Sequence, residues 1–181
     1  MRKKSLTVLT ALSLASMAFT VSTYAGNRAG TASFGLGAGY DYFSSKREIK
    51  NTGIPFVQAG YNFTDRWGIE GLLGFFNTQF KQSVQDNRQI NGTLVAVDGV
   101  YRLIPYQSFE PYLLAGVGAI GLNPNRNEAH NEGNINAGIG GEFFIEKSIA
   151  FRLEARDFYT MVGEKNDVFF DGGITFLLDL C

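Results

Sequence analysis

The sequence has little of the chemistry that enzymes and metalloproteins use. Its single cysteine, Cys181, is the last residue, so an internal disulfide is excluded, and paired-cysteine and zinc-ligand patterns are absent. The single histidine, His130, stands in a polar run with no serine nearby in the sequence, which argues against nucleophilic catalysis. No block of basic residues suggests a nucleic-acid partner. The sequence therefore predicts no catalytic residue, no metal site and no cofactor.

Long apolar runs are also missing, except near the amino terminus. There, three basic residues at positions 2–4 precede an apolar run over residues 6–21, and small residues stand at Thr23 and Ala25. The run has about 16 residues, fewer than the ~18 that a membrane-spanning helix needs. We expect residues 1–25 to be a secretory signal peptide cleaved after Ala25, and residues 26–181 to form one domain. Cleavage removes three positive charges and no acidic ones, which takes the formal net charge from −1 to −4.

From Thr31 onward, segments of about 10 to 13 residues rich in glycine, aromatic and β-branched residues alternate with polar connections. We count about eight such segments: residues 31–43, 53–63, 67–79, 92–103, 111–122, 133–144, 149–160 and 168–180. The connections 64–66, 105–110 and 145–148 are short, whereas 44–52, 80–91, 123–132 and 161–167 are longer and polar. Short turns at one end and longer loops at the other are typical of outer-membrane barrels, whose longer loops face outward.

The clearest alternation lies in residues 149–159, where a period of two puts Arg152, Glu154 and Arg156 on one face and apolar residues on the other. A soluble barrel would show the same alternation turned inside out. In the other segments, however, the non-apolar face is mainly glycine with isolated charges and almost no lysine, which favours a charged face inside a narrow barrel. We therefore predict an all-β fold, an eight-stranded antiparallel up-and-down transmembrane β-barrel. In residues 111–122 both faces are apolar or glycine, and the sequence does not choose between them.

The same parity gathers a set of charged side chains in the barrel lumen. The set comprises Glu70, Asp98, Arg102, Glu142, Arg152, Glu154 and Arg156, with Asp41 and Asp171 nearer the longer loops. Each unpaired ion inside the barrel would cost several kcal/mol, so we expect ion pairs between strands. These pairs either seal the lumen or rearrange to open a narrow polar path, and the residues leave both interpretations open.

Aromatic residues cluster near both expected rims of the wall, as an interfacial girdle requires. Near the short turns these are Tyr61, Phe63, Trp67, Tyr101, Phe143 and Phe151, and near the longer loops Tyr40, Tyr42, Phe75, Tyr159 and Phe170.

The segments LVAVDGVYRL and EPYLLAGVGAIGL, followed by GNINAGIGGEFF and IAFRLEAR, resemble the transmembrane domain of OmpA-like outer-membrane proteins. The resemblance implies an eight-stranded barrel in the outer membrane, with a lumen network of acidic and basic residues that controls a small pore. Glu70, Arg102, Glu142 and Arg152 stand at strand positions that resemble this network, with Arg102 where a lysine is common. Outer-membrane lipid, lipopolysaccharide and the barrel-assembly machinery are the partners that it implies.

Two departures from the family pattern stand out. Many members continue into a peptidoglycan-binding domain, and this sequence stops after its last predicted strand. The last strand also lacks the terminal aromatic residue that the assembly machinery reads, so Phe176 or Leu180 would have to substitute for it.

The sequence predicts a non-enzymatic outer-membrane barrel with a structural role and a narrow, porin-like polar lumen. The alternative is an adhesin or host-factor-binding protein that acts through loops near Lys46, Arg47 and Arg126. A lipid-modifying enzyme is a weaker hypothesis, because it needs a serine and a histidine facing the membrane, and His130 is the only histidine.

Overall fold

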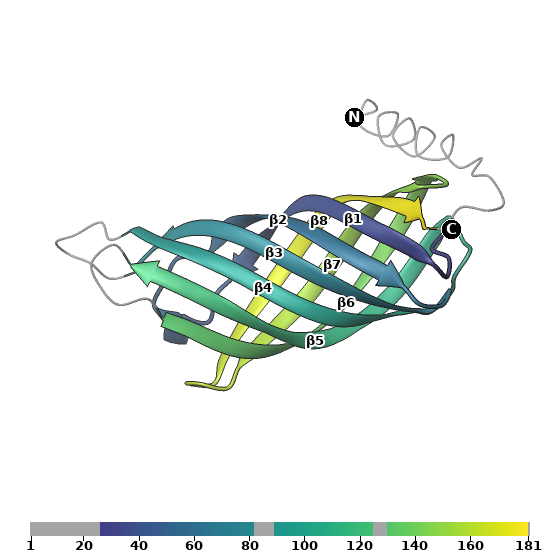
Figure 1. The fold of residues 1–181 in the computed structure, drawn as a ribbon. Coiled ribbons are helices and arrows are strands. Elements are labelled where there is room, and N and C mark those ends of the chain that lie inside the picture. The colour runs from purple at the N-terminus through teal and green to yellow at the C-terminus, as the bar shows by residue number, and fades with distance from the viewer. Residues whose placement is uncertain (1–25, 82–88, 125–129, 181) are drawn as a thin grey trace, which may run out of the picture.

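Eight antiparallel strands form a closed barrel in the computed structural model, which describes residues 26–81, 89–124 and 130–180 (Figure 1). The strands are β1 (Thr31–Tyr42), β2 (Thr52–Asn62), β3 (Trp67–Gln79), β4 (Gln89–Arg102), β5 (Phe109–Pro124), β6 (His130–Glu146), β7 (Ile149–Thr160) and β8 (Lys165–Asp179), with a short 3-10 helix η1 (Ser45–Arg47). Each strand pairs with the next along the chain, and β8 closes the barrel on β1. This confirms the predicted fold class. The expected signal peptide, Arg126 and Cys181 lie outside the described residues.

We call the two ends of the barrel the turn end and the loop end. The turn end carries the connections 63–66, 103–108 and 147–148, together with the described ends of the chain, on the right in Figure 1. The loop end carries the connections 43–51, 80–88, 125–129 and 161–164. Of the described residues, none belongs to a helix long and apolar enough to cross a membrane.

Several strands are longer than the sequence predicted. β4 begins at Gln89, β8 begins at Lys165, and β5 and β6 run from Phe109 to Pro124 and from His130 to Glu146. The predicted loops 80–91, 123–132 and 161–167 and the turn 105–110 were therefore too long. The reason is that strand pairing uses the backbone, so polar pairs such as Asn77↔Asn91 continue the ladder where the apolar pattern has stopped.

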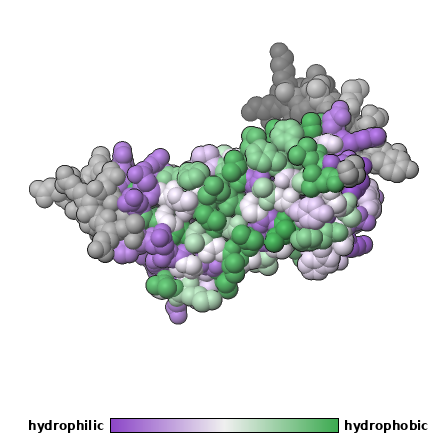
Figure 2. Space-filling model, in the orientation of Figure 1, coloured by the Kyte–Doolittle hydropathy of each residue, from purple (hydrophilic) through white to green (hydrophobic). Residues whose placement is uncertain are grey.

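The outer face of the wall is apolar. Leu36, Val97, Val117, Ile139 and Leu153, on five different strands, are all more than 40% exposed. Figure 2 shows hydrophobic residues over the middle of this face and hydrophilic residues toward both ends. A continuous apolar exterior of this kind suits contact with lipid and not with water.

Aromatic residues pair on the outer face at both ends of the wall. Trp67 and Tyr101 lie with ring centroids 4.7 Å apart near the turn end, and Tyr42 and Phe170 lie 6.0 Å apart near the loop end. Phe109 stacks on Phe143 at 4.4 Å. These positions agree with the predicted girdles at the two rims.

Inward glycines make room for large side chains across the narrow lumen. A methyl group at Gly92 would overlap the ring of Phe76, and one at Gly140 would overlap the ring of Tyr112. The structure also settles the orientation of β5, because Tyr112 is buried inside the barrel and Leu113 is exposed.

Candidate functional site in the barrel lumen

Arg152 lies at the centre of the charged lumen. Its Nη2 donates to Oε1 of Glu70 on β3 at 2.8 Å and to Oε2 of Glu154 on its own strand at 2.5 Å, and its Nη1 pairs with Glu70. The guanidinium stacks 4.7 Å from the ring centroid of Tyr112, whose hydroxyl donates to Glu154 at 2.7 Å. Because the guanidinium is planar, its N–H groups bind two carboxylates while its face stacks on an aromatic ring.

Arg156, two inward positions beyond Arg152 on β7, extends the network toward the loop end. Its Nε donates to Glu154 at 2.8 Å, and its Nη1 donates to Asp98 on β4 at 2.6 Å. The side chains of Arg156, Glu154 and Asp98 are all fully buried. Five of the seven predicted site residues therefore form one continuous set of ion pairs across three strands.

The remaining two predicted site residues, Arg102 and Glu142, lie nearer the turn end, and their contacts with oppositely charged groups are longer. Nε of Arg102 lies 3.9 Å from Glu142 and 3.8 Å from Glu110, both longer than hydrogen bonds. Glu142 is also 4.0 Å from Nη1 of Arg152, which joins it to the central set. The structure thus brings all seven residues into the lumen, where each is at most 7% exposed.

Sequence reasoning missed Glu110, Asn27 and Asn62, which complete this end of the lumen. Glu110 is fully buried and accepts from Asn27, which in turn accepts from Asn62 at 3.0 Å. Glu110 had been assigned to a turn. Its own charge was the signal, because a carboxylate two residues before Tyr112 could have extended the strand and marked the inward face that the apolar residues left undecided.

Asp41 and Asp171 are also inside the barrel. Asp41 lies near the loop end as predicted, whereas Asp171 pairs with Glu154 across β7 and β8 and therefore lies level with the ion pairs. Both are buried, and within the described part of the chain their carboxylate oxygens have no hydrogen-bond partner. They lie outside the compact set of ion pairs around Arg152.

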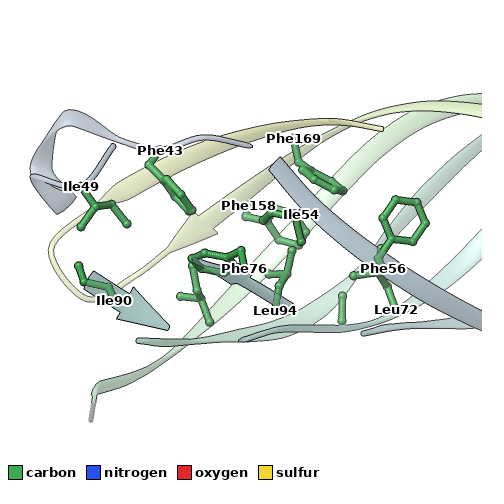
Figure 3. Packing of buried hydrophobic residues seen from close by; sticks show 12 residues of the cluster. Phe43, Ile49, Ile54, Phe56, Leu72, Phe76, Ile90, Leu94, Phe158 and Phe169 are labelled. Atoms are coloured by element: carbon green, nitrogen blue, oxygen red, sulfur yellow. The ribbon is translucent and has the colours of Figure 1, made fainter. Parts of the chain in front are cut away.

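The loop-end half of the lumen is filled mainly by apolar side chains, which the sequence did not predict, although Asp41, Asn134 and Asn136 are also buried there. Twelve buried hydrophobic residues pack there in one cluster, the apolar plug: Phe43, Ile49, Ile54, Phe56, Leu72, Phe76, Ile90, Leu94, Ala96, Ile120, Phe158 and Phe169. Figure 3 shows their side chains reaching into the barrel from several strands, with Phe43 and Ile49 coming from the connection between β1 and β2. The lumen therefore combines a charged turn-end half with a loop-end half in which apolar side chains predominate.

Arg47 fastens the loop that lies over the apolar plug. Its side chain is 1% exposed, and it donates to Asp167 at 2.7 Å, to Glu132 at 2.6 Å and to Thr160 at 2.9 Å. Lys165 forms a second ion pair with Glu132. We call this set the Arg47 clasp. Arg47, which lies in one of the loops considered for surface binding, is therefore not an exposed charge, because three neighbours bind it inside the barrel mouth.

The turn end is joined by a smaller contact between connections. Oδ1 of Asp65 accepts from the backbone N of Ala29 at 3.0 Å, and the hydroxyl of Tyr106 also hydrogen-bonds to this carboxylate. Tyr106 and, to a smaller extent, Ala29 lower the pKa of Asp65, while the carboxylate raises the pKa of Tyr106. The amino-terminal segment is thereby tied to two separate turns.

The arrangement favours holding the barrel closed over performing a reaction. Its central carboxylates are paired with guanidinium groups, which leaves none free and accessible to act as a general acid or base. Over residues 26–81, 89–124 and 130–180, no group of three or more potential metal ligands occurs. His130 is exposed at the start of β6.

Comparison with known proteins agrees with this geometry. The family model described as an outer membrane protein beta-barrel domain matches residues 11–174. Comparison with curated proteins by sequence gave no match.

Several solved structures share the fold at low sequence identity. OprG of Pseudomonas aeruginosa has a TM-score of 0.65 at 15% identity, over 84% of this chain and 98% of that one. The amino-terminal barrel of OprF from the same organism has a TM-score of 0.62 at 14% identity, over 84% and 99%. Ail, the attachment invasion locus protein of Yersinia pestis, has a TM-score of 0.54 at 18% identity, over 83% and 99%. With the family match and the closed antiparallel barrel, the chain belongs to the outer membrane protein β-barrel family and is located in the outer membrane.

Proposed function

We propose that this protein is a sealed structural barrel of the outer membrane, with no enzymatic activity and with a lumen that supports the wall instead of carrying solute. The apolar plug is the observation that carries the proposal. A path for ions needs polar lining along its whole length, and an apolar constriction excludes water. Here, twelve buried hydrophobic side chains pack into one cluster in the loop-end half.

The ion pairs of the turn-end half support the same conclusion. Arg152 and Arg156 bind Glu70, Asp98 and Glu154 at hydrogen-bond distance, so opening a path would require breaking several buried charged contacts together. Breaking a buried ion pair costs about 3 to 5 kcal/mol. Rearrangement of these pairs as a gate would also leave the apolar plug in place.

Single-channel recording tests this proposal. Protein refolded into a planar bilayer is expected to give no reproducible conductance steps, whereas regular ohmic steps would overturn it. Phe76→Ala and Phe75→Ala form a matched pair, because the two rings are neighbours on β3 and only Phe76 points into the plug. If the wild-type protein conducts and only the Phe76 variant changes the conductance, the path runs through the plug.

A surface-interaction role is the second candidate, and one observation favours it. Met161 and Val162, in the connection between β7 and β8, are 65% and 66% exposed at the loop end. Exposed apolar residues on a loop can anchor a protein partner.

Cell-adhesion assays with the wild type and a Met161→Ser/Val162→Ser variant, both folded, discriminate between the structural role and the surface-interaction role. Loss of adhesion in the variant supports the interaction role, and absence of adhesion by the wild type removes it.

A further inference from the structure

Asn27 closes the turn end of the lumen from the segment that precedes β1. Its side-chain amide donates to Oε2 of Glu110 at 2.9 Å and to Oε2 of Glu142 at 2.5 Å, and its backbone N donates to Glu110 at 3.3 Å. Its own oxygen accepts from Asn62 at 3.0 Å. A buried residue with four such contacts fixes the chain at this point, two residues after the expected cleavage site.

The carboxylates that Asn27 joins outnumber the positive charges beside them. Glu110 and Glu142 face Arg102, whose Nε stays 3.8 and 3.9 Å away, and Arg152 approaches Glu142 only to 4.0 Å while it binds Glu70 and Glu154. The Asn27 amide donates hydrogen bonds but adds no charge. The group Arg102, Glu110 and Glu142 therefore has one negative charge in excess, in a place where an unbalanced ion is costly.

Gly26 lies directly against this excess charge. A methyl group added at Gly26 would overlap Oε1 of Glu110 and would reach within 3.0 Å of the Cα of Tyr106, so the Gly26 backbone is in close contact with the carboxylate. Hydrolysis of the Ala25–Gly26 bond consumes one water, leaves a carboxylate on Ala25 and releases an amine on Gly26. That amine takes up a proton at neutral pH, because its ordinary pKa is about 7.7 to 8.0.

We propose that the α-ammonium created at Gly26 by signal-peptide cleavage binds Glu110 as a structural ion pair, so that processing completes the seal at the turn end. The inference rests on the cleavage site expected from the sequence. It does not depend on whether the lumen conducts. In the uncleaved chain the same nitrogen is a neutral amide and leaves the excess charge unbalanced.

Several charged and titratable groups surround the position of the ammonium. They are Arg102 on β4, Glu110 on β5, Glu142 on β6, Arg28 in the same segment, and Asp65 and Tyr106 in the adjoining turns. Of the atoms that a methyl group at Gly26 would meet, Oε1 of Glu110 is the nearest, and the same oxygen accepts from the backbone N of Tyr106 at 2.7 Å. Burial of Gly26 lowers the pKa of the ammonium, whereas the net negative surroundings raise it, and the proposal requires the second effect to be the larger.

Two chain lengths test the proposal. A chain that begins at Gly26 is compared with one that begins at Tyr24, which moves the amine two residues away, and both are refolded into the same lipid bilayers. At pH 7 the chain that begins at Gly26 is expected to have an unfolding equilibrium constant about tenfold smaller, as for a charge-assisted hydrogen bond. While Glu110 stays ionised, this advantage should be complete below the ordinary pKa of the amine and should be lost as the pH rises through its raised value.

Two further measurements make the result specific to the ion pair. Glu110→Gln in both lengths should abolish the difference between them. Independently of any variant, the ammonium of carbon-labelled Gly26 should titrate by NMR above pH 8 in the folded chain. Equal stability of the two lengths at pH 7, an advantage that persists at pH 10.5, or an ordinary titration would each overturn the proposal.

Discussion

Arg152 shows how one residue links the two sides of the lumen. It contacts Glu70, Glu154 and the ring of Tyr112. Arg152→Ala would leave the buried carboxylate of Glu70 without its main partner, whereas Glu154 would keep its hydrogen bond from Arg156, and we expect the free energy of unfolding to fall by about 3 kcal/mol. Urea unfolding in lipid bilayers measures this loss.

The control for Arg152 is Arg28→Ala. The ion pair of Arg28 with Asp179 is 3.1 Å long, but both side chains are largely exposed, so its loss should cost less than about 1 kcal/mol. Equal effects of the two substitutions would mean that water reaches the carboxylates around Arg152, and the lumen would then be open.

Most of the lumen network could be predicted residue by residue, because the period of two assigns each strand residue to a face. This placed Glu70, Asp98 and Arg152 correctly inside the barrel. Residues outside a regular pattern were missed. Asn27 precedes the first strand, and Arg47 lies in a loop where nothing in the sequence shows that it turns into the barrel mouth.

Among the elements, the strands were predictable and their loop-end limits were not. Apolar alternation ends where the wall leaves the lipid, but pairing such as Gln79↔Gln89 continues beyond it. The same alternation explains why the apolar plug was missed. Ile54, Phe76 and Leu94 lie on the same inward parity as the charged residues, and the period of two does not show that they gather at one end of the lumen.

The connection between β1 and β2 acts as a cover that the Arg47 clasp holds down. Ile49 from this connection is buried in the apolar plug, and Arg47 binds Asp167, Glu132 and Thr160. Arg47→Ala is expected to cost about 2 kcal/mol, because it leaves the buried carboxylate of Asp167 without its charged partner. Limited proteolysis should then cut the connection faster, and urea unfolding should show the loss of stability.

Lys46→Ala is the matched control for the clasp. Lys46 is the preceding residue, and its ion pair with Glu164 is exposed, so little change in cleavage or stability is expected. If proteolysis of the β1–β2 connection is equally slow in Arg47→Ala and in Lys46→Ala, the clasp is not needed. Packing of Ile49 and Phe43 in the apolar plug would then keep the connection in place.

For the molecule as a whole, the lumen contents form successive layers from the turn end to the loop end. The Asn27 amide and its carboxylates come first, then the ion pairs of Arg152 and Arg156, then the apolar plug, and last the Arg47 clasp. Each layer joins strands that are not neighbours in the wall, such as β3 with β7 and β4 with β7. The layers therefore brace the barrel across its diameter, which backbone pairing between neighbouring strands cannot do.

The position of the barrel in the membrane makes a prediction about its outer surface. Val117 is 61% exposed and lies at mid-height on β5, where it pairs with Val97 and Ile135. Val117→Lys should lower the free energy of unfolding in a lipid bilayer by about 2 to 4 kcal/mol, because its charge would lie near the bilayer midplane.

Met161→Lys is the control, on an equally exposed residue of the β7–β8 connection. It should lower the free energy of unfolding by no more than about 1 kcal/mol, because that site lies at the membrane surface or beyond it. Reversible unfolding of both variants in the same vesicles decides the matter: a clear difference fits a wall that spans the bilayer, and equal costs would contradict it.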